Sequence, residues 1–180
     1  MAAHIAWGAY LILAFLAAPA LFRLRWGRWP FAYALPPRDA YTLVDLAFGA
    51  ALALYTAALY LGPAPEPVSV AWGLAIFIAG YALQVWAIVE MGRHWRIGQD
   101  ARDETVEYVA RGPFPLLKHP IYVSLIMIAI GQTLLAGFDG RSFLLVMASV
   151  IYFCVQGRAE TLEWRKRSRS QSDASAPGDG

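Results

Sequence analysis

The sequence predicts an all-α protein, a polytopic membrane bundle of about five transmembrane helices with the N-terminus outside and the C-terminus in the cytoplasm. Apolar residues make up 58% of the 180 positions and charged residues only 16%, whereas a soluble domain carries about 25% charge. Several runs approach the roughly 20 apolar residues that a membrane-spanning helix needs. The Lys and Arg residues gather in alternate connections, as they do when those connections share the cytoplasmic side.

Five apolar runs define the predicted spans. They are residues 3–22, 43–62, 70–89, 121–138 and 142–156. The first run carries no charge, and its basic cluster follows it rather than preceding it, which predicts a retained span and not a cleaved signal peptide. The last two runs are short for about 30 Å of hydrocarbon, so tilt or a hairpin arrangement is expected there.

The basic residues provide an independent test of the topology. With five spans, the first connection, the third connection and the tail share one side, and together they hold 14 of the 15 Lys and Arg residues. Arg141 is the exception. The positive-inside rule therefore places these segments in the cytoplasm, and a cell inner membrane is the expected location.

The chain is predicted to form a single transmembrane domain over residues 1–167. Residues 168–180 are rich in Ser, Ala, Asp and Gly and are predicted to be a disordered tail. The connection 91–120 is long and polar but keeps Trp95, Tyr108 and Phe114, so we expect it to be ordered and functional. With one cysteine, Cys154, the chain has no intrachain disulfide and no cysteine-based zinc site, and no metal site is predicted.

The segment from Gly112 to Tyr122 is the most informative motif. It reads Gly-Pro-Phe-Pro-Leu-Leu-Lys-His-Pro-Ile-Tyr and precedes the fourth span. Pro120 suits a first helical turn and restricts His119 to an extended conformation. The imidazole is therefore expected at the mouth of a helix, beside backbone N–H groups that favour anions. Tyr122 follows within the same turn.

This segment resembles the signature of the isoprenylcysteine carboxyl methyltransferase and phospholipid methyltransferase superfamily. Residues 92–95, Gly-Arg-His-Trp, resemble the Gly-Arg-x-Trp element that precedes the signature in that family. The similarity covers roughly residues 85–163. It implies an integral membrane enzyme that binds S-adenosylmethionine at the cytoplasmic face and methylates a lipophilic small molecule, lipid or lipidated substrate. Membrane lipids are expected partners, and nucleic acids are not.

The resemblance also implies roles for individual residues. The residues implied to bind the cofactor are Gln99, Val106, Glu107, Tyr108, Val109, Phe114, His119, Pro120, Ile121, Tyr122, Glu160 and Glu163. Arg158 is implied to orient the substrate, and Arg158 with Glu160 forms the implied catalytic pair. The chain departs from the family pattern at Phe114, where Tyr is usual, and at Thr161, which replaces the second residue of a Glu-Glu pair.

The chemistry of methyl transfer favours some acceptors over others. A carboxylate needs no base and a phenol or enol only a modest one, whereas a protonated amine must first lose a proton. No strong dedicated base is evident, and Asp45 and Glu90, near span ends, are expected to have no role. O-methylation is therefore favoured. Phospholipid N-methylation, an NADPH-dependent membrane reductase of the sterol reductase type and a non-catalytic membrane protein remain alternatives.

Overall fold

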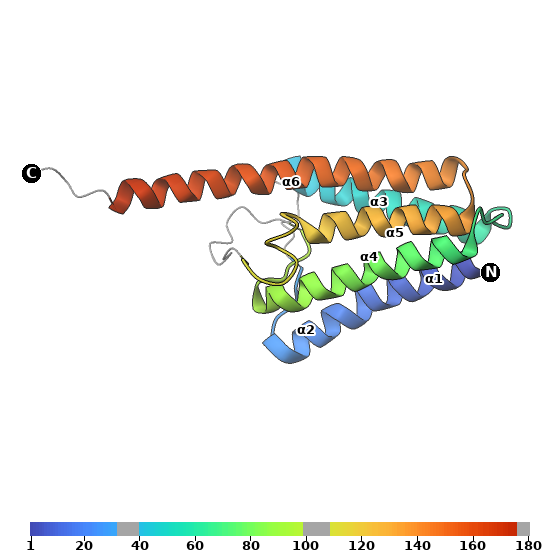
Figure 1. Cartoon of the computed structure of the whole chain (residues 1–180), viewed down its shortest axis with the longest axis horizontal. Helices are drawn as coiled ribbons and strands as arrows, with labels where there is room; N and C mark the ends of the chain where they lie inside the picture. Colours follow the sequence, from blue (N-terminus) through green and yellow to red (C-terminus); the bar gives the residue numbers. More distant parts are fainter. Residues whose placement is uncertain (32–39, 99–108, 176–180) are drawn as a thin grey trace, which may run out of the picture.

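The computed structural model describes residues 1–31, 40–98 and 109–175, and these residues form a helical bundle. The chain order of the helices is α1 (Ala2–Ile12), α2 (Ala18–Trp26), α3 (Ala40–Leu61), α4 (Val70–Met91), α5 (Pro120–Ala136) and α6 (Gly140–Ser175) (Figure 1). A π-helical segment, η1 (Leu13–Ala17), joins α1 to α2, and a 3-10 turn, η2 (Gly92–His94), follows α4. The predicted all-α fold class is confirmed.

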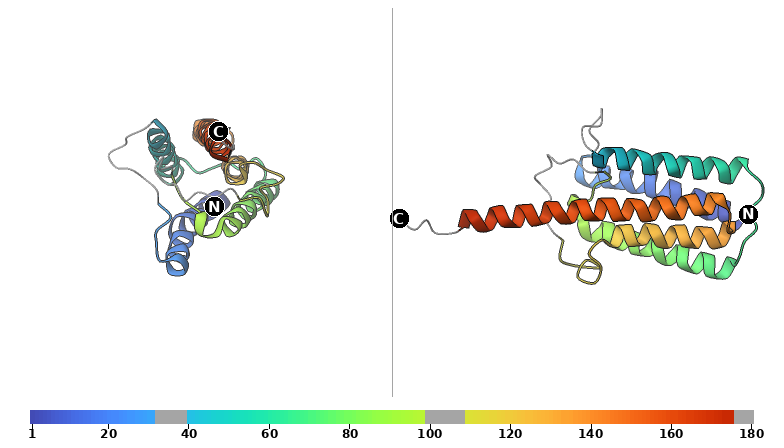
Figure 2. Two further views of the ribbon diagram at one scale, coloured as in Figure 1. Left: turned by 90° about the vertical axis from the view of Figure 1, so that its left-hand side faces the viewer. Right: turned by 90° about the horizontal axis from the view of Figure 1, so that it is seen from above.

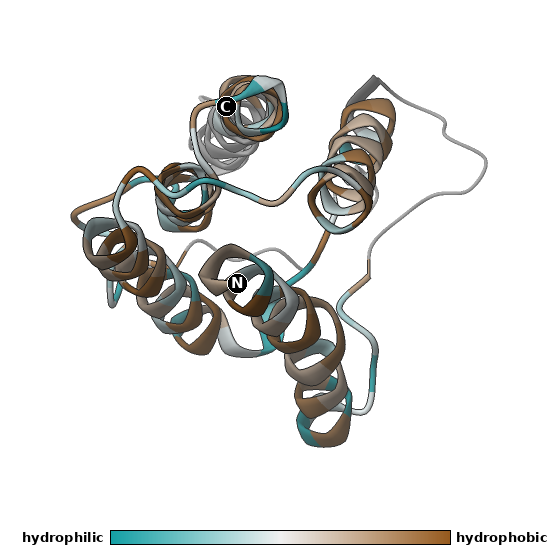
Figure 3. Ribbon diagram, turned by 90° about the vertical axis from the view of Figure 1, so that its right-hand side faces the viewer, coloured by the Kyte–Doolittle hydropathy of each residue, from teal (hydrophilic) through white to brown (hydrophobic). Residues whose placement is uncertain are grey.

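Four helices are long and apolar enough to span a membrane: Ala2–Trp26, Thr42–Leu61, Val70–His94 and Gly140–Arg158. The fifth apolar helix, α5, has only 17 residues and measures about 26 Å at 1.5 Å per residue. Most of the ribbon of these helices has the brown colour of hydrophobic residues in Figure 3, and many large apolar side chains are exposed, among them Leu16, Leu54 and Trp72. The five predicted spans therefore correspond to five helices, one of them short.

Helix α6 is longer than its membrane span. The span predicted over residues 142–156 corresponds to Gly140–Arg158, and the helix continues without a break to Ser175 and projects beyond the other helices (Figures 1 and 2). Residues 168–175, predicted as part of a disordered tail, are helical in the structure. No Gly or Pro lies between Arg158 and Pro177, so nothing in the backbone chemistry ends the helix earlier.

Pro19 explains the irregularity in the first span. A proline inside an α-helix lacks the N–H that would bond to the carbonyl four residues earlier, and its ring collides with that carbonyl, here that of Phe15. The π-helical turn Leu13–Ala17 lies immediately before it. Widening the helix at that point accommodates the ring without ending the span.

Glycines allow α4 and α5 to pack closely. A Cβ at Gly131 would lie 2.6 Å from the Phe77 nitrogen, and one at Gly73 would lie 2.8 Å from the Leu135 side chain. A Cβ at Gly80 would likewise lie 3.0 Å from the Ser124 carbonyl oxygen. Small residues at helix interfaces allow this approach in a lipid environment, where packing rather than water exclusion holds helices together.

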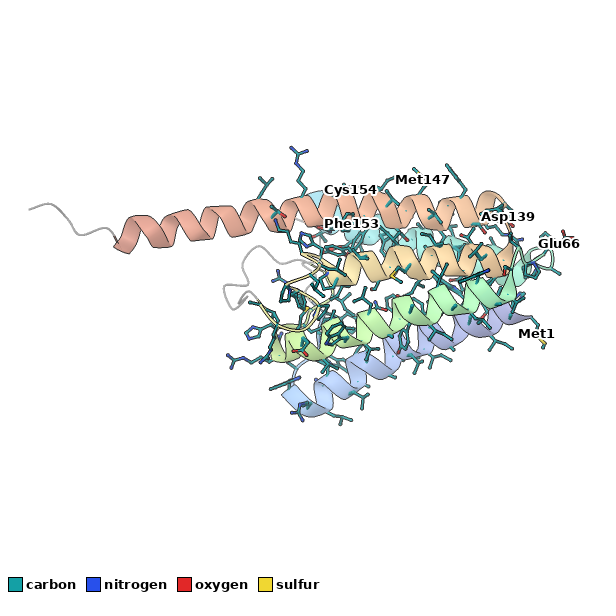
Figure 4. All side chains as sticks on the ribbon, viewed as in Figure 1. Met1, Glu66, Asp139, Met147, Phe153 and Cys154 are labelled. Carbon is teal, nitrogen blue, oxygen red and sulfur yellow. The ribbon has the colours of Figure 1, made fainter. Side chains whose placement is uncertain are left out.

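The turns at one end of the bundle are fixed by hydrogen bonds. The backbone nitrogens of Val68 and Ser69 donate to the Leu134 carbonyl, which ties the start of α4 to the end of α5. The Arg141 guanidinium donates to the Pro63 carbonyl at 3.0 Å and pairs with Asp139. Figure 4 shows Asp139 at this end, near Glu66 of the α3–α4 turn.

Helices α1 and α3 are joined near this same end. The Trp7 indole donates to the Thr56 hydroxyl at 2.9 Å, and the Tyr60 hydroxyl donates to the His4 carbonyl at 2.7 Å. Trp7 also packs edge-to-face on Tyr55, with ring centroids 5.0 Å apart. These contacts lie in the first two turns of α1.

The opposite end gathers the basic connections. Arg28 donates to the Arg93 carbonyl at 2.6 Å. Phe31 and Ile97 form an isolated bridge, and Phe22 packs edge-to-face on the buried Trp95. The first and third connections therefore share one end of the bundle, as the charge pattern predicted, whereas Arg141 lies at the other.

Candidate active site

A cavity of about 260 Å³ lies at the basic end of the bundle and extends between the helices. One part of its wall comes from the connection between α4 and α5 and from the start of α5. These residues are Trp95, Arg96, Ile97, Gly98, Val109, Phe114, Lys118, His119, Pro120, Ile121 and Tyr122. The remaining wall comes from residues within the bundle, on α1, η1, α3 and α4, with Ala18 of α2, Leu125 of α5 and Tyr152 of α6.

His119 occupies the N-cap position of α5. Its backbone has φ −133°, Pro120 follows as the first helical residue, and no side chain caps the helix. This is the conformation that the His-Pro sequence predicts. The N–H groups at the start of α5 therefore lie at the cavity wall, where they favour an anionic group.

The imidazole of His119 is held by α6. Its Nε2 lies 3.4 Å from Thr161 Oγ1, and the Thr161 hydroxyl donates its proton to the Gly157 carbonyl at 2.7 Å. Because that hydroxyl has only one proton, it accepts from His119, so Nε2 carries the hydrogen. A Cβ at Gly157 would lie 3.5 Å from His119 Cδ2, so the imidazole ring packs closely against α6 at this glycine.

An aromatic cluster surrounds this histidine. The rings of His119 and Tyr122 stack with centroids 5.6 Å apart, and Phe153 packs edge-on against both. Tyr122 also contacts Tyr152, which stacks on Phe48 at 4.3 Å. Figure 4 shows Phe153 on α6 beside the start of α5. The cluster fixes the motif side chains against α6 and α3.

Gly112 docks the connection onto the end of α4. Its φ is +63°, and a Cβ there would lie 2.2 Å from Glu90 Cγ. The neighbouring Arg111 pairs with the Glu90 carboxylate at 3.4 Å. The motif glycine is thus required both for its backbone conformation and for space. Glu90, for which no role was expected, anchors this turn.

Polar side chains also line the cavity within the bundle. Gln84 Nε2 donates to the Tyr10 hydroxyl at 3.5 Å, and Gln156 Nε2 donates to Asp45 Oδ1 at 2.7 Å. Asp45 and Gln84 are buried, with 6% and 9% of their surface exposed. Buried polar groups at membrane depth are costly and commonly functional.

The cavity wall reaches the outer surface of the bundle between η1 and α3. Phe15 and Gly49 line the cavity and are both exposed. A Cβ at Gly49 would meet nothing within 4 Å. Neither residue is charged or polar, and an apolar rim of this kind suits a lipid-soluble molecule.

The structure brings together part of the predicted site. Six of the implied cofactor residues line one cavity: Val109, Phe114, His119, Pro120, Ile121 and Tyr122. Arg158 is exposed and is not among the residues lining it. Gln99, Val106, Glu107 and Tyr108 lie outside the described residues, as do the side chains of Glu160 and Glu163.

Several cavity residues were not singled out from the sequence. Tyr10, Asp45 and Gln84 belong to apolar spans, and Arg96 was counted only as a cytoplasmic base, whereas Lys118 was noted as part of the motif without a binding role. Acidic and amide side chains inside apolar runs were the available signal. Asp45, to which the sequence analysis assigned no role, lies in the cavity wall.

The bundle and its cavity define a class: multi-pass membrane proteins with a site formed jointly by one polar connection and the helices themselves. Within that class, the model of the isoprenylcysteine carboxyl methyltransferase (ICMT) family matches residues 73–163, which is 91 of the 180 residues. The chain belongs to this family, whose members are S-adenosylmethionine-dependent membrane methyltransferases. No curated protein and no solved structure matches the chain at a significant level.

The family match divides the cavity in two. It includes α4 from Gly73, the connection, all of α5 and α6 as far as Glu163, and therefore the whole wall that contains His119 and Tyr122. Tyr10, Phe15, Asp45 and Gly49 lie before residue 73 and outside the match. The motif wall is shared with the family, whereas the α1 and α3 wall belongs to the part that the family model does not cover.

Proposed function

We propose that this protein transfers a methyl group from S-adenosylmethionine to the oxygen of a lipophilic acceptor. The main support for this proposal is a single cavity that extends from the motif segment, at the basic end of the bundle, to an apolar rim between η1 and α3. A polar donor and a lipid-soluble acceptor need such a two-sided site, because they arrive from different solvents.

The motif wall has the chemistry to hold the methyl donor. Arg96, Lys118 and the uncapped N-terminus of α5 favour its carboxylate. Phe114 and Trp95 offer aromatic surface for its purine. When bound, the donor supplies an already activated methyl on sulfur, so the protein's task is alignment and exclusion of water.

His119 and Tyr122 are proposed to position the donor. Because Thr161 accepts the Nε2 proton, the imidazole has a fixed tautomer and ring orientation. Stacking on Tyr122 and the edge contact with Phe153 restrict both rings further. A rigid wall of this kind supports in-line transfer, which depends on near-attack geometry.

Asp45 is proposed to accept a proton when the acceptor is a phenol or enol. Its carboxylate is buried, lines the cavity and is oriented by Gln156. In that reaction the acceptor oxygen loses its hydrogen to Asp45 as it gains the methyl group. A carboxylate acceptor needs no such step, and a second negative charge so near would oppose its binding.

The basic end of the bundle is proposed to face the cytoplasm. Arg28, Arg93 and Arg111 lie at this end, and Arg141 lies at the other. This places the motif wall on the side where S-adenosylmethionine is made available to the enzyme. Arg158 and Glu160, near the middle of α6, remain proposed as substrate- and cofactor-orienting residues on the same side.

Binding of the demethylated product, S-adenosylhomocysteine, tests the proposal directly. Purified protein in detergent should show saturable binding, and His119→Ala should weaken it several-fold. Transfer of labelled methyl to an extract of membrane lipids should then depend on the same residue. Absence of saturable binding, or equal binding of NADPH in parallel titrations, would overturn the proposal.

A further inference from the structure

The Tyr10–Gln84 pair is a buried polar site inside an otherwise apolar part of the cavity. Tyr10 is 3% exposed and Gln84 is 9% exposed, and both line the cavity. Gln84 Nε2 donates to the Tyr10 hydroxyl. Within the part of the chain that the structure describes, Gln84 Oε1 is buried and has no hydrogen-bond partner.

The side-chain amide of Gln84 has one polar atom without a protein partner, and exchanging its nitrogen and oxygen by a flip of the amide does not change this. The Tyr10 hydroxyl can accept from the amide nitrogen or donate to the amide oxygen, but it satisfies only one of the two. An unpartnered buried polar group destabilises the folded protein. Such a group at a cavity wall is explained if a bound molecule completes it.

The Tyr10–Gln84 pair lies at nearly the same level along the bundle as the start of α5, which carries the end of the motif. Gly80 on α4 packs against Ser124 and Met127 of the antiparallel α5, and Gln84 lies one turn nearer to the start of α5. Gln84 is therefore near the level of the first turn of α5, which contains Tyr122. A polar group that reaches Gln84 belongs to the head of the acceptor and not to the far end of its chain.

We infer that Tyr10 and Gln84 form an acceptor-recognition site, which selects lipophilic acceptors with a second hydrogen-bonding group beside the one that is methylated. The inference rests on the proposed function in taking this cavity as the acceptor site. A simple fatty acid, prenol or monohydric alkylphenol leaves the amide unpartnered. An acylated prenylcysteine or a dihydroxy alkylbenzene completes it.

The pair also joins two different parts of the chain. Gln84 lies within the region that the family model matches, whereas Tyr10 lies outside it. The N-terminal helix thus completes a recognition site that α4 presents to the cavity. Acceptor selectivity is thereby assigned to a contact between residues 74 positions apart.

Matched ligands test this inference without any methyl transfer. One pair is 5-pentadecylresorcinol and 3-pentadecylphenol, which differ by one hydroxyl. The other is N-acetyl-S-farnesylcysteine and S-farnesylthiopropionate, which differ by the acetamide group. Dissociation constants follow from the rise in thermal unfolding midpoint with ligand concentration in a fixed detergent. We expect the two-group ligand to bind at least about fivefold more tightly in one pair or both.

Gln84→Leu should abolish this preference while leaving the fold intact. Leu has similar bulk and removes the unpartnered amide oxygen, but it also removes the partner of the buried Tyr10 hydroxyl. Because these two effects oppose each other, the unliganded variant should unfold at a temperature close to that of the wild type. Gln132→Leu is the matched control, because Gln132 is a fully buried glutamine of α5 that is not among the cavity-lining residues. It should retain the preference.

The outcomes separate this inference from the proposed function. The absence of a preference in both pairs, a preference that persists in Gln84→Leu, or no saturable ligand binding would each overturn the inference. S-Adenosylhomocysteine binding is measured on the same preparations. If the protein prefers the two-group ligands but does not bind S-adenosylhomocysteine, the proposed function is overturned and the recognition site is still supported.

Discussion

The imidazole Nε2 of His119 lies 3.4 Å from the hydroxyl oxygen of Thr161, a residue 42 positions further along the chain. In the resemblance drawn from the sequence, Thr161 replaces the second residue of a Glu-Glu pair. A neutral hydroxyl here holds the histidine by accepting one proton and adds no negative charge beside the start of α5. Thr161 therefore contributes to the position of the motif histidine.

Thr161→Val should loosen this histidine without removing it. Loss of one hydrogen bond is worth about 0.5–1.5 kcal/mol, so S-adenosylhomocysteine should bind about two- to tenfold more weakly. Isothermal titration in detergent measures this. Thr133→Val is the matched control, because Thr133 makes the same bond to the carbonyl four residues earlier, far from His119. Equal effects of the two variants would contradict a positioning role for Thr161.

Gly112→Ala should displace the motif connection. The new Cβ would meet Glu90 at 2.2 Å in a backbone conformation with φ +63°, which costs about 1–2 kcal/mol for an L-residue before any clash. Donor binding should fall at least about tenfold. Gly140→Ala, where a Cβ meets nothing within 4 Å, should be neutral. Normal binding by Gly112→Ala would show that the docking on Glu90 is dispensable.

Gly49→Phe should obstruct the apolar rim. The space around Gly49 admits a ring without displacing protein atoms near Cβ. The KM for a lipophilic acceptor should rise at least about tenfold, while S-adenosylhomocysteine binding should stay within about twofold because the motif wall is untouched. Ala50→Phe adds the same ring at a neighbouring exposed position outside the cavity lining. If both variants behave like the wild type, acceptors enter by another route.

Asp45→Asn distinguishes acceptor chemistries. With a phenolic acceptor, loss of the proton acceptor should lower kcat by about 10²-fold or more. With a carboxylate acceptor, the rate should be unchanged or rise, since a buried negative charge has been removed. Single-turnover methyl transfer with one acceptor of each kind measures both effects. A similar loss with both acceptors would point to a structural role for the Asp45–Gln156 bond.

The Asp139–Arg141 pair should make stability depend on pH at the opposite end of the bundle. Burial raises the pKa of Asp139, but hydrogen bonds from the Arg141 side chain and the Ser142 backbone outweigh it and hold that pKa below its usual value. A lowered pKa in the folded state means that this stabilisation is present above the ordinary carboxyl pKa and is lost as the pH falls through the lowered one.

Asp139→Asn keeps the backbone cap but removes the charge. It should cost about 0.2–1 kcal/mol near neutral pH, as for a partly exposed ion pair, and the difference from the wild type should vanish in acid. Thermal unfolding midpoints of both proteins across an acidic pH series measure this. If the difference in unfolding midpoint between the two proteins grew as the pH fell, the pKa of Asp139 would not be lowered in the folded state.

The sequence predicted the parts of this protein that local patterns determine. The apolar runs predicted the helices. The segregation of the Lys and Arg residues predicted that the first and third connections lie at the same end of the bundle, and the His-Pro pair predicted the start of α5. The Tyr10–Gln84 and Asp45–Gln156 contacts were not predictable in this way. Their partners lie 74 and 111 residues apart, and each residue alone resembles an ordinary polar position in an apolar run.

Local sequence patterns also predicted the ends of helices less well than their existence. The continuation of α6 to Ser175 contradicts the expected tail over residues 168–175, because composition indicates solvation but does not show where a helix ends. The π-helical turn before Pro19 depends on how the carbonyl four residues earlier is accommodated, which a hydropathy pattern does not record. The roles implied for Arg158, Glu160 and Glu163 stay predictions.

The brevity of α5 has a consequence for the surrounding bilayer. Helices α4 and α5 are level at one end, where Val68 and Ser69 bond to Leu134, and they contain 22 and 17 residues. The start of α5 therefore falls about 7 Å short of the end of α4. The connection packs over this difference in level, since Gly112 lies against Glu90 near the end of α4. A helix of 17 residues is shorter than the roughly 30 Å of hydrocarbon in a typical bilayer. The thickness of the host membrane is therefore expected to affect the enzyme, since a thicker bilayer would have to thin beside α5.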